Sequence, residues 1–153
     1  MEPLNLPTYF FRLKEDRGKK YIFDEIRRRF VILTPEEWVR QHMVNYLITV
    51  KNYPRSLISV EKGFSQNRNR QRYDLLIYNK SGHPVMIVEC KAPGMEITQK
   101  VFDQAGRYNN RHKASYMLIT NGVKHYCCHI NLISRQYQFL PDIPFYSELI
   151  LED

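Results

Sequence analysis

The sequence predicts a mixed α+β fold, a layer of strands and helices rather than a helical bundle or a sandwich. Short apolar runs rich in Val, Ile and Tyr alternate with turn formers, and two longer stretches carry apolar residues at helical spacing. The chain has 153 residues, of which 43% are hydrophobic and 25% charged, as in a soluble globular protein. We therefore expect a single domain, with an N-terminal β-hairpin extension over residues 1–33 and a core over residues 34–140.

The extension and the first helix are predicted from their turn and cap residues. Short strands at residues 9–13 and 21–23 flank a polar turn that contains glycine. A helix then runs from Thr34 to about Val50, because Thr34 is a good N-cap and Pro35 suits the first helical position.

Two adjacent glutamates in the first turn of this helix have different predicted roles. Glu37 lies three residues after the cap, where it can complete a capping box, so its presence needs no functional explanation. Glu36 falls at the end of the apolar stripe of the helix, where a carboxylate is unusual, and it is a candidate catalytic acid. A first-turn glutamate that favours the helix dipole and keeps its head in solvent is equally consistent with the sequence.

The rest of the chain alternates strands with a second helix. A turn at Ala92-Pro93-Gly94 precedes this helix, and Asn121-Gly122 is a strong hairpin signal. The predicted elements are strands at residues 57–64, 72–78 and 85–91, a helix at 96–112, and strands at 116–120, 123–133 and 136–140.

Charged residues interrupt the hairpin that residues 72–78 and 85–91 are predicted to form. With an even loop centred on Ser81-Gly82, Asp74 faces Glu89 across the two strands. Lys91 lies two residues beyond Glu89 and shares its face, at about 7 Å along the strand. A three-residue loop without a bulge would instead place Asp74 and Glu89 on opposite faces.

This constellation suits metal-assisted hydrolysis of a phosphodiester. Mg²⁺ (or Mn²⁺) is typically held by one or two carboxylates and by phosphate oxygens of the substrate, so Asp74 and Glu89 are the expected metal ligands. Lys91 would orient the attacking water or offset charge at the phosphorus. An exposed cluster of ion pairs is the structural alternative, because this spacing also occurs by chance.

The positive charge favours a polyanionic partner. The net charge is +7, and Arg70, Arg72 and Arg107 are candidate phosphate contacts near the predicted site. Each of them could also belong to an ordinary solvated surface. Gln104 and Tyr108, one turn apart on the second helix, would reach a nucleic acid if that helix packs across the hairpin, and would otherwise be a boundary Gln and a core Tyr.

The sequence suggests a cytoplasmic protein with no contact with a membrane. Its apolar runs are too short to span a bilayer, and its start shows no signal-peptide pattern. The three cysteines are badly spaced for disulfides and are expected to be reduced. His125, Cys127 and His129 alternate along a predicted strand and could bind zinc, but their spacing fits no known finger or ribbon, and ordinary strand residues are the preferred interpretation.

Several of these segments, taken in order, resemble a known family. They are Thr34 to Gln41, Arg72-Tyr73-Asp74, Ile87 to Pro93, Gln104-x-x-x-Tyr108 and Thr120-Asn121-Gly122. Together they resemble the N-terminal nuclease domain of type I restriction enzyme R subunits, within the PD-(D/E)xK nuclease superfamily, over residues 34–133. Tyr73 stands where the motif often has Pro, which leaves the acid at Asp74 intact.

The resemblance implies a restriction-endonuclease-like core, a central mixed β-sheet flanked by helices. It implies that Asp74 and Glu89 are metal ligands, Lys91 the catalytic lysine and Glu36 an acid on the helix, with Gln104 and Tyr108 in the motif that follows the catalytic core. The expected function is hydrolysis of DNA, with a homodimer, a motor or a specificity subunit as further partners. A non-cleaving nucleic-acid-binding or assembly module is the alternative, and an RNA or modified-base substrate is also consistent with the motifs.

Overall fold

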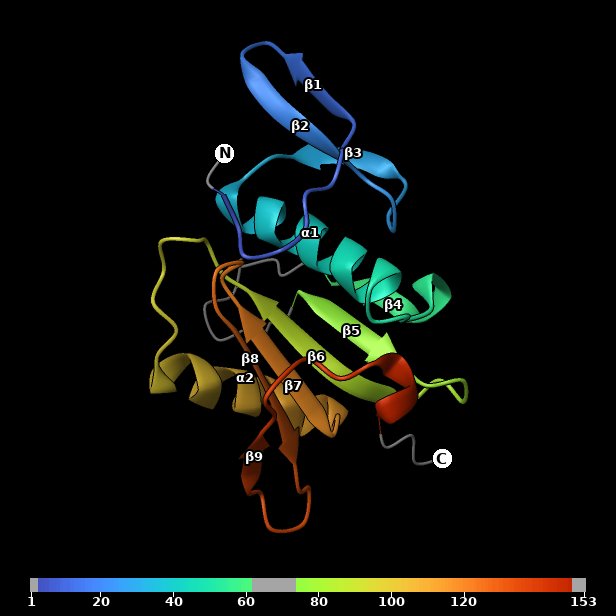
Figure 1. Ribbon diagram of the computed structural model, residues 1–153, viewed down its shortest axis with the longest axis vertical. Helices are drawn as coiled ribbons and strands as arrows, with labels where there is room; N and C mark the ends of the chain where they lie inside the picture. The colour runs from blue at the N-terminus through green and yellow to red at the C-terminus, as the bar shows by residue number, and fades with distance from the viewer. Residues whose placement is uncertain (1–2, 62–73, 150–153) are drawn as a thin grey trace.

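A computed structural model of the chain describes residues 3–61 and 74–149. It shows a mixed α+β architecture, as predicted, with two sheets and two α-helices (Figure 1). The larger sheet has six strands in the order β4-β5-β6-β7-β8-β9. These are β4 (Ile58–Val60), β5 (Leu75–Tyr78), β6 (Pro84–Cys90), β7 (Tyr116–Thr120), β8 (His125–Ile130) and β9 (Tyr137–Phe139).

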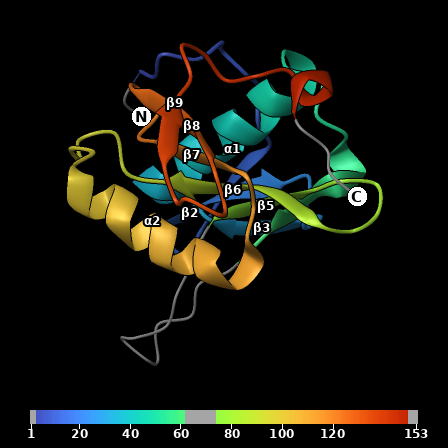
Figure 2. The ribbon, with the colours of Figure 1, turned by 90° about the horizontal axis from the view of Figure 1, so that it is seen from below.

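The two helices cover opposite faces of the six-stranded sheet (Figure 2). Helix α1 (Pro35–Thr49) packs Val39, Met43 and Leu47 onto one face, and all three side chains are fully buried. Helix α2 (Gln99–His112) packs Phe102 and Ala105 onto the other face. The strands between the helices are therefore buried on both sides, which explains their nearly continuous apolar sequences.

The predicted register of the β5–β6 hairpin is confirmed for the paired residues Leu75 to Ile77. Leu75 pairs with Val88 and Leu76 with Ile87. Asp74 precedes the first of these pairs, and its amide donates to the carbonyl of Val88, the residue opposite Leu75. The facing of Asp74 and Glu89 therefore stays a prediction. A shift between Ile77 and Tyr78 is confined to the turn end of the hairpin.

Strand β6 also pairs with β7, in parallel, and the connection between them carries α2. This helix begins at Gln99 after the N-cap Thr98, three residues later than predicted. The loop before the helix is anchored by a hydrogen bond of 2.9 Å from the Asn121 side-chain amide to the Met95 carbonyl. Residues 96–98 therefore extend the loop rather than the helix.

The N-terminal extension is a three-stranded sheet rather than the predicted hairpin. Strands β1 (Leu13–Asp16), β2 (Lys19–Asp24) and β3 (Arg29–Ile32) pair antiparallel in chain order and stand above α1 in Figure 1. The first strand also begins four residues later than expected. The third strand was not predicted. Its first residue ends a run of arginines, but the rest of it, Phe30 to Ile32, is an apolar run of the kind that predicts a strand.

No described helix is long and apolar enough to cross a membrane. The cysteines Cys90, Cys127 and Cys128 are free thiols, as expected.

Candidate active site

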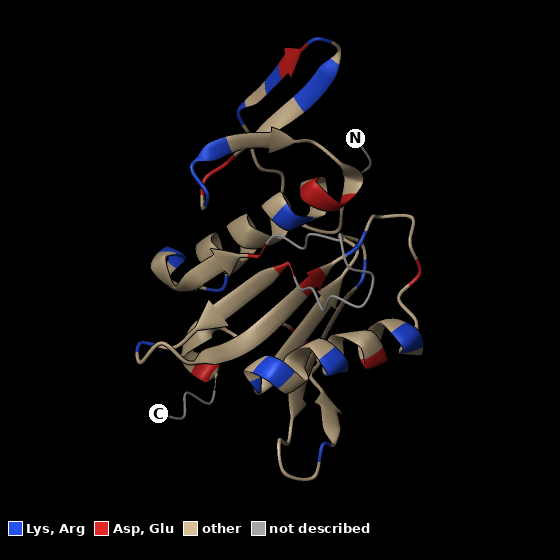
Figure 3. Cartoon of the chain, turned by 180° about the vertical axis from the view of Figure 1, so that it is seen from behind, with Lys and Arg blue, Asp and Glu red and all other residues tan. Residues whose placement is uncertain are grey.

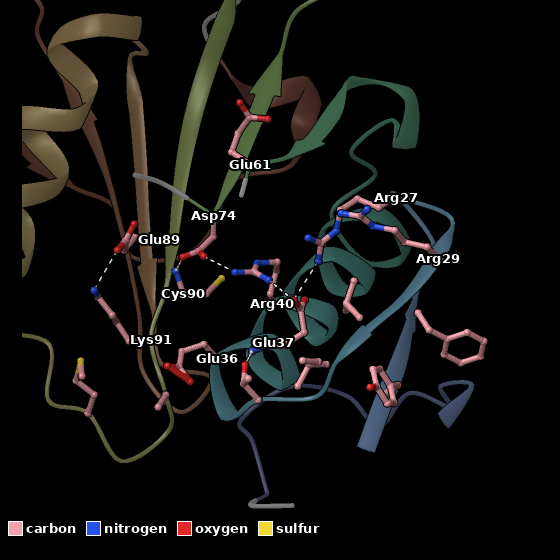
Figure 4. Close-up of a pocket in the computed structure, with 17 residues that line it drawn as sticks. Arg27, Arg29, Glu36, Glu37, Arg40, Glu61, Asp74, Glu89, Cys90 and Lys91 are labelled. Atoms are coloured by element: carbon pink, nitrogen blue, oxygen red, sulfur yellow. Dashed lines mark hydrogen bonds and ion pairs between the residues drawn. The ribbon is translucent and has the colours of Figure 1, made fainter. Parts of the chain in front are cut away.

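A cavity of about 700 Å³ opens where the N-terminal sheet, the start of α1 and the ends of β5 and β6 meet. Four of the predicted residues line it: Glu36, Asp74, Glu89 and Lys91. Figure 4 shows these side chains among basic groups from the N-terminal segment and from α1. The predicted acids and the lysine are therefore brought together, although they come from three separate segments of the chain.

Asp74 lies immediately before β5 and is held by two donors. Its Oδ2 accepts a hydrogen bond of 2.5 Å from the backbone amide of Cys90, and its Oδ1 pairs with Arg40 Nη2 at 2.5 Å. Its own amide donates to the Val88 carbonyl at 2.9 Å. The carboxylate is thus fixed between the end of β6 and α1.

Glu89 and Lys91 are placed by the end of β6. Val88 and Cys90 belong to the core on the α1 side and Ile87 to the core on the α2 side, so strand alternation places Glu89 on the α2 side. Glu89 is only 8% exposed, and its Oε1 pairs with Lys91 Nζ at 3.0 Å. The Lys91 amide donates to the Thr120 carbonyl at 2.8 Å, so pairing with β7 fixes the backbone that carries the ammonium group.

Arg40 was not predicted as a site residue, yet it connects the site to α1. It pairs with Asp74 and, through its other terminal nitrogen, with Glu37. Burial would lower the pKa of Arg40, but the carboxylates of Asp74 and Glu37 outweigh burial and raise the pKa. Arg40 is therefore permanently charged. The only sequence signal for it was the spacing of three residues from Glu37, which is common in surface helices.

Glu37 does not form the predicted capping box. The Thr34 hydroxyl accepts a hydrogen bond of 3.0 Å from the Glu37 amide, which confirms the cap. The Glu37 carboxylate instead accepts from Arg27, Arg40 and Gln41 and is buried. Two arginine partners outcompete the backbone amide of the cap for this carboxylate.

A second buried acid anchors Arg27. Asp24, which is 1% exposed, accepts from the amides of Ile26 and Arg27 and pairs with the Arg27 guanidinium at 2.6 Å. Burial would raise the pKa of Asp24, but the hydrogen bonds and charge of Arg27 outweigh burial and lower the pKa. Ion pairs therefore run without a break from Asp24 through Arg27, Glu37 and Arg40 to Asp74.

Cys90 lines the cavity without being a nucleophile. Burial, with a smaller contribution from Asp74, raises the pKa of the Cys90 thiol well above its ordinary value. The side chain therefore stays a neutral thiol and acts as an apolar wall, while its backbone amide holds Asp74.

Glu36 is exposed, in contrast to Glu37, and lines the cavity at the start of α1. Its exposure agrees with a first-turn glutamate whose head is in solvent. Its place on the cavity wall leaves the catalytic role open as a prediction.

Of the predicted nucleic-acid contacts, the three that the structure describes do not line this cavity. Tyr108 is 9% exposed in the core and Gln104 is half-buried, whereas Arg107 is exposed and lines a separate depression beside the C-terminal half of α2. Arg70 and Arg72 lie outside the described residues. The roles of these five residues stay predictions.

The alternative zinc site has no support in the geometry. His125 Nδ1 lies 2.7 Å from the Thr120 hydroxyl, and the His129 ring packs against Tyr116. Burial raises the pKa of Cys127 to about 12, which disfavours the thiolate that zinc requires. Within residues 3–61 and 74–149, no three His, Cys, Asp or Glu side chains form a group that could hold a metal ion.

The donors of Asp74 and Glu89 fit a hard divalent cation that is shared with a substrate. Both side chains line one cavity, and each carboxylate oxygen has two lone pairs, so the Asp74 oxygens can accept more than their present bonds. Mg²⁺ typically takes one or two carboxylates, several waters and phosphate oxygens, rather than a cage made only of protein groups.

Comparison with known proteins places the chain in a family. Residues 35–144, about 72% of its length, match the family described as type I restriction enzyme R protein N terminus. No curated protein matches the chain. The matched segment contains both helices and the six-stranded sheet with Asp74, Glu89 and Lys91, and it leaves out the N-terminal sheet. The chain belongs to the family of type I restriction enzyme R protein N termini.

Proposed function

We propose that the protein hydrolyses phosphodiester bonds in DNA at the cavity between α1 and the ends of β5 and β6. The observation that carries the proposal is the convergence of Asp74, Glu89 and Lys91 on one cavity at adjacent strand ends. Membership of a restriction-enzyme family supports a nuclease-related role and DNA as the substrate.

Asp74 and Glu89 would hold Mg²⁺ or Mn²⁺. The bound ion would neutralise charge on the scissile phosphate and lower the pKa of water. The chain itself fixes both carboxylates before substrate binds, Asp74 through Arg40 and the Cys90 amide, and Glu89 through its strand. Such preorganisation is favourable because the site need not reorder as charge develops.

Lys91 would act on the phosphate side of the reaction. Its ammonium group pairs with Glu89 and is partly exposed to the cavity, so it can turn to a phosphate oxygen or an attacking water. Glu36, which lines the same cavity at the start of α1, is the proposed further acid. Gln104, Tyr108, Arg70, Arg72 and Arg107 are the proposed contacts to more distant parts of the DNA.

One such site cuts one strand, so we expect nicking by a monomer and double-strand cleavage only by two copies. A homodimer would provide the second copy. A motor or specificity subunit, as in a multi-subunit restriction enzyme, would deliver the DNA.

Cleavage of supercoiled plasmid and of single-stranded DNA in Mg²⁺ or Mn²⁺ tests the proposal. Asp74→Asn and Lys91→Met should each slow nicking by about 10²–10³-fold, as when one stabilising group is lost from an active site. Glu96→Gln is the control, because Glu96 is exposed and does not line the cavity. Cleavage that survives both site variants would overturn the assignment, and tight DNA binding without cleavage would favour the non-cleaving module.

A further inference from the structure

The N-terminal sheet has one partly buried face and one face that combines aromatic rings with cations. Its inner face carries Ile22 and Asp24, which are 0% and 1% exposed. Strand pairing places Lys14 beside Tyr21, Tyr21 beside Ile32, and Phe23 beside Phe30 on the opposite face. We call this second face, with Arg12, Lys14, Tyr21, Phe23, Phe30 and Ile32, the outer face.

Cations on the outer face already stack on its rings. The Arg12 guanidinium lies 4.4 Å from the centre of the Phe23 ring, and Lys14 Nζ lies 4.4 Å from that of Phe30. Phe23 and Phe30 meet edge to face at 5.2 Å. Both cations are exposed and Tyr21 is half-buried, so solvent reaches the outer side of the stack.

The segment around this face holds most of the excess positive charge. Residues 12–29 contain eight basic and four acidic side chains, and so supply +4 of the net charge of +7. Figure 3 shows Lys and Arg along β2 and at the start of β3. A polyanion is therefore the partner with complementary charge.

The outer face is continuous with the candidate active site. Tyr21, Phe30 and Ile32 line the same cavity as Asp74 and Glu89. Arg29 lies on the wall of the cavity that faces the two acids (Figure 4). A chain molecule that places a phosphate at the acids can therefore continue along the N-terminal sheet.

We propose that the outer face binds unpaired nucleotides of the DNA next to the scissile phosphate, with Arg12 and Lys14 on phosphates or bases and Tyr21 under a base. The proposal rests on the proposed nuclease function for its substrate. Single-stranded nucleic acid is bound by this combination of cations with exposed aromatic faces, because every base can stack and every nucleotide carries a phosphate. In an intact duplex the bases stack on each other and are closed to such a face.

Binding of a labelled oligo(dT) tests the proposal by fluorescence anisotropy in EDTA, with the Asp74→Asn variant as the parent so that no cleavage occurs. An oligonucleotide of about 20 residues exceeds the 4–16 nucleotides that one such surface usually covers. Arg12→Gln with Lys14→Gln should weaken binding about tenfold. It should also reduce the slope of log affinity against log salt by about 1.4, because each lost phosphate contact on a single strand removes about 0.7.

A matched control separates the outer face from general charge. Arg17→Gln with Lys20→Gln removes the same charge from the turn and the other face of the same sheet, and should weaken binding less than about threefold. Tyr21→Leu should weaken binding about tenfold without changing the salt slope, since stacking contributes about 1–3 kcal/mol per base. Thermal unfolding of each variant verifies that the sheet is folded.

Equal losses from the two double variants would overturn the proposal, as would no loss from either, or an equal loss for a duplex of the same sequence. The readout is independent of catalysis. If none of the proteins cleaves DNA but the difference between the double variants persists, the proposed function fails and the binding face stands. If cleavage depends on Asp74 and Lys91 but the difference between the double variants disappears, the proposed function stands and the binding face fails.

Discussion

Two pairs of acids lie close to the same cavity and differ in what holds them. Asp24 and Glu37, at the junction between the N-terminal sheet and α1, both pair with Arg27, and each accepts at least three hydrogen bonds. Asp74 and Glu89 lie near neighbouring strand ends, the first held by Arg40 and a backbone amide and the second paired with Lys91.

Burial alone does not distinguish these pairs. Glu37 and Glu89 are 6% and 8% exposed. The difference lies in the partners. Asp24 and Glu37 share Arg27, which connects the N-terminal sheet to α1, whereas Glu89 pairs with a lysine of its own strand and Asp74 combines an arginine with a backbone amide. A carboxylate that joins two elements stabilises their packing, and one at a strand end on a cavity can bind a cation. Arg40 contacts one acid of each pair, so the two roles are physically connected.

Replacing Arg40 should have the largest effect on stability, because one acid of each pair depends on it. Arg40→Met leaves Asp74 and Glu37 with a lost partner each, and removing one member of a buried ion pair costs about 3–5 kcal/mol. Urea denaturation should show this loss in the free energy of unfolding. Arg107→Met removes an exposed arginine from α2 and should change it by less than about 0.5 kcal/mol. A loss below about 1 kcal/mol for Arg40→Met would mean that the acids are satisfied without the bridge.

Replacing Asp24 should have a smaller effect that depends on pH. Asp24→Asn keeps an oxygen for the two backbone amides but loses the charge that pairs with Arg27, a change worth about 1.5–3 kcal/mol at neutral pH. The pKa of Asp24 is lowered in the folded protein, so its stabilisation is complete above the ordinary value of 3.8 and disappears as the pH falls through the lowered value.

The difference in unfolding free energy between the wild type and Asp24→Asn should therefore shrink below about pH 4. Urea denaturation between pH 3 and pH 7 would measure it. Glu25→Gln, in the same turn but exposed, should show no comparable difference at any pH. A difference that stays constant down to pH 3 would show that the charge of Asp24 is not the stabilising feature.

The sequence was sufficient to predict Asp74 and Glu89 as site residues, but not the roles of Asp24 and Glu37, for a physical reason. The approach of Asp74 and Glu89 to one cavity follows from their places in one short hairpin, and the pairing of Lys91 with Glu89 follows from strand alternation. The Thr34 cap and the turn at Asn121-Gly122 were likewise local, and the structure confirms both.

The contacts of Asp24 and Glu37 join the N-terminal sheet to α1, and no local sequence pattern specifies how these two elements pack against each other. Arg27 pairs with Glu37 of α1 across the third strand, and this strand was not predicted, although its residues Phe30 to Ile32 are apolar. The same limit applies to α2. The spacing of Gln104 and Tyr108 was clear, but how far the helix lies from the acids depends on packing that no local pattern specifies.

Glu36 provides the finest test of the difference between the two pairs, because it lies on the cavity without belonging to either of them. Its side chain is exposed, so Glu36→Gln should change the free energy of unfolding by less than about 0.5 kcal/mol. If Glu36 is the further acid, its loss should slow cleavage by about tenfold. That is less than the 10²–10⁴-fold of a firmly positioned acid or base, because nothing in the described structure fixes its carboxylate.

Glu37→Gln is the matched comparison for this test, since it makes the same chemical change at the next position of the same helix. It removes the charge that pairs with Arg27 and Arg40, and should destabilise the protein by more than about 1.5 kcal/mol. Urea denaturation and plasmid nicking, measured on both variants, separate the two glutamates. Unchanged nicking by Glu36→Gln would remove Glu36 from the site, because a folded protein with its only alteration on the cavity wall would then cleave normally.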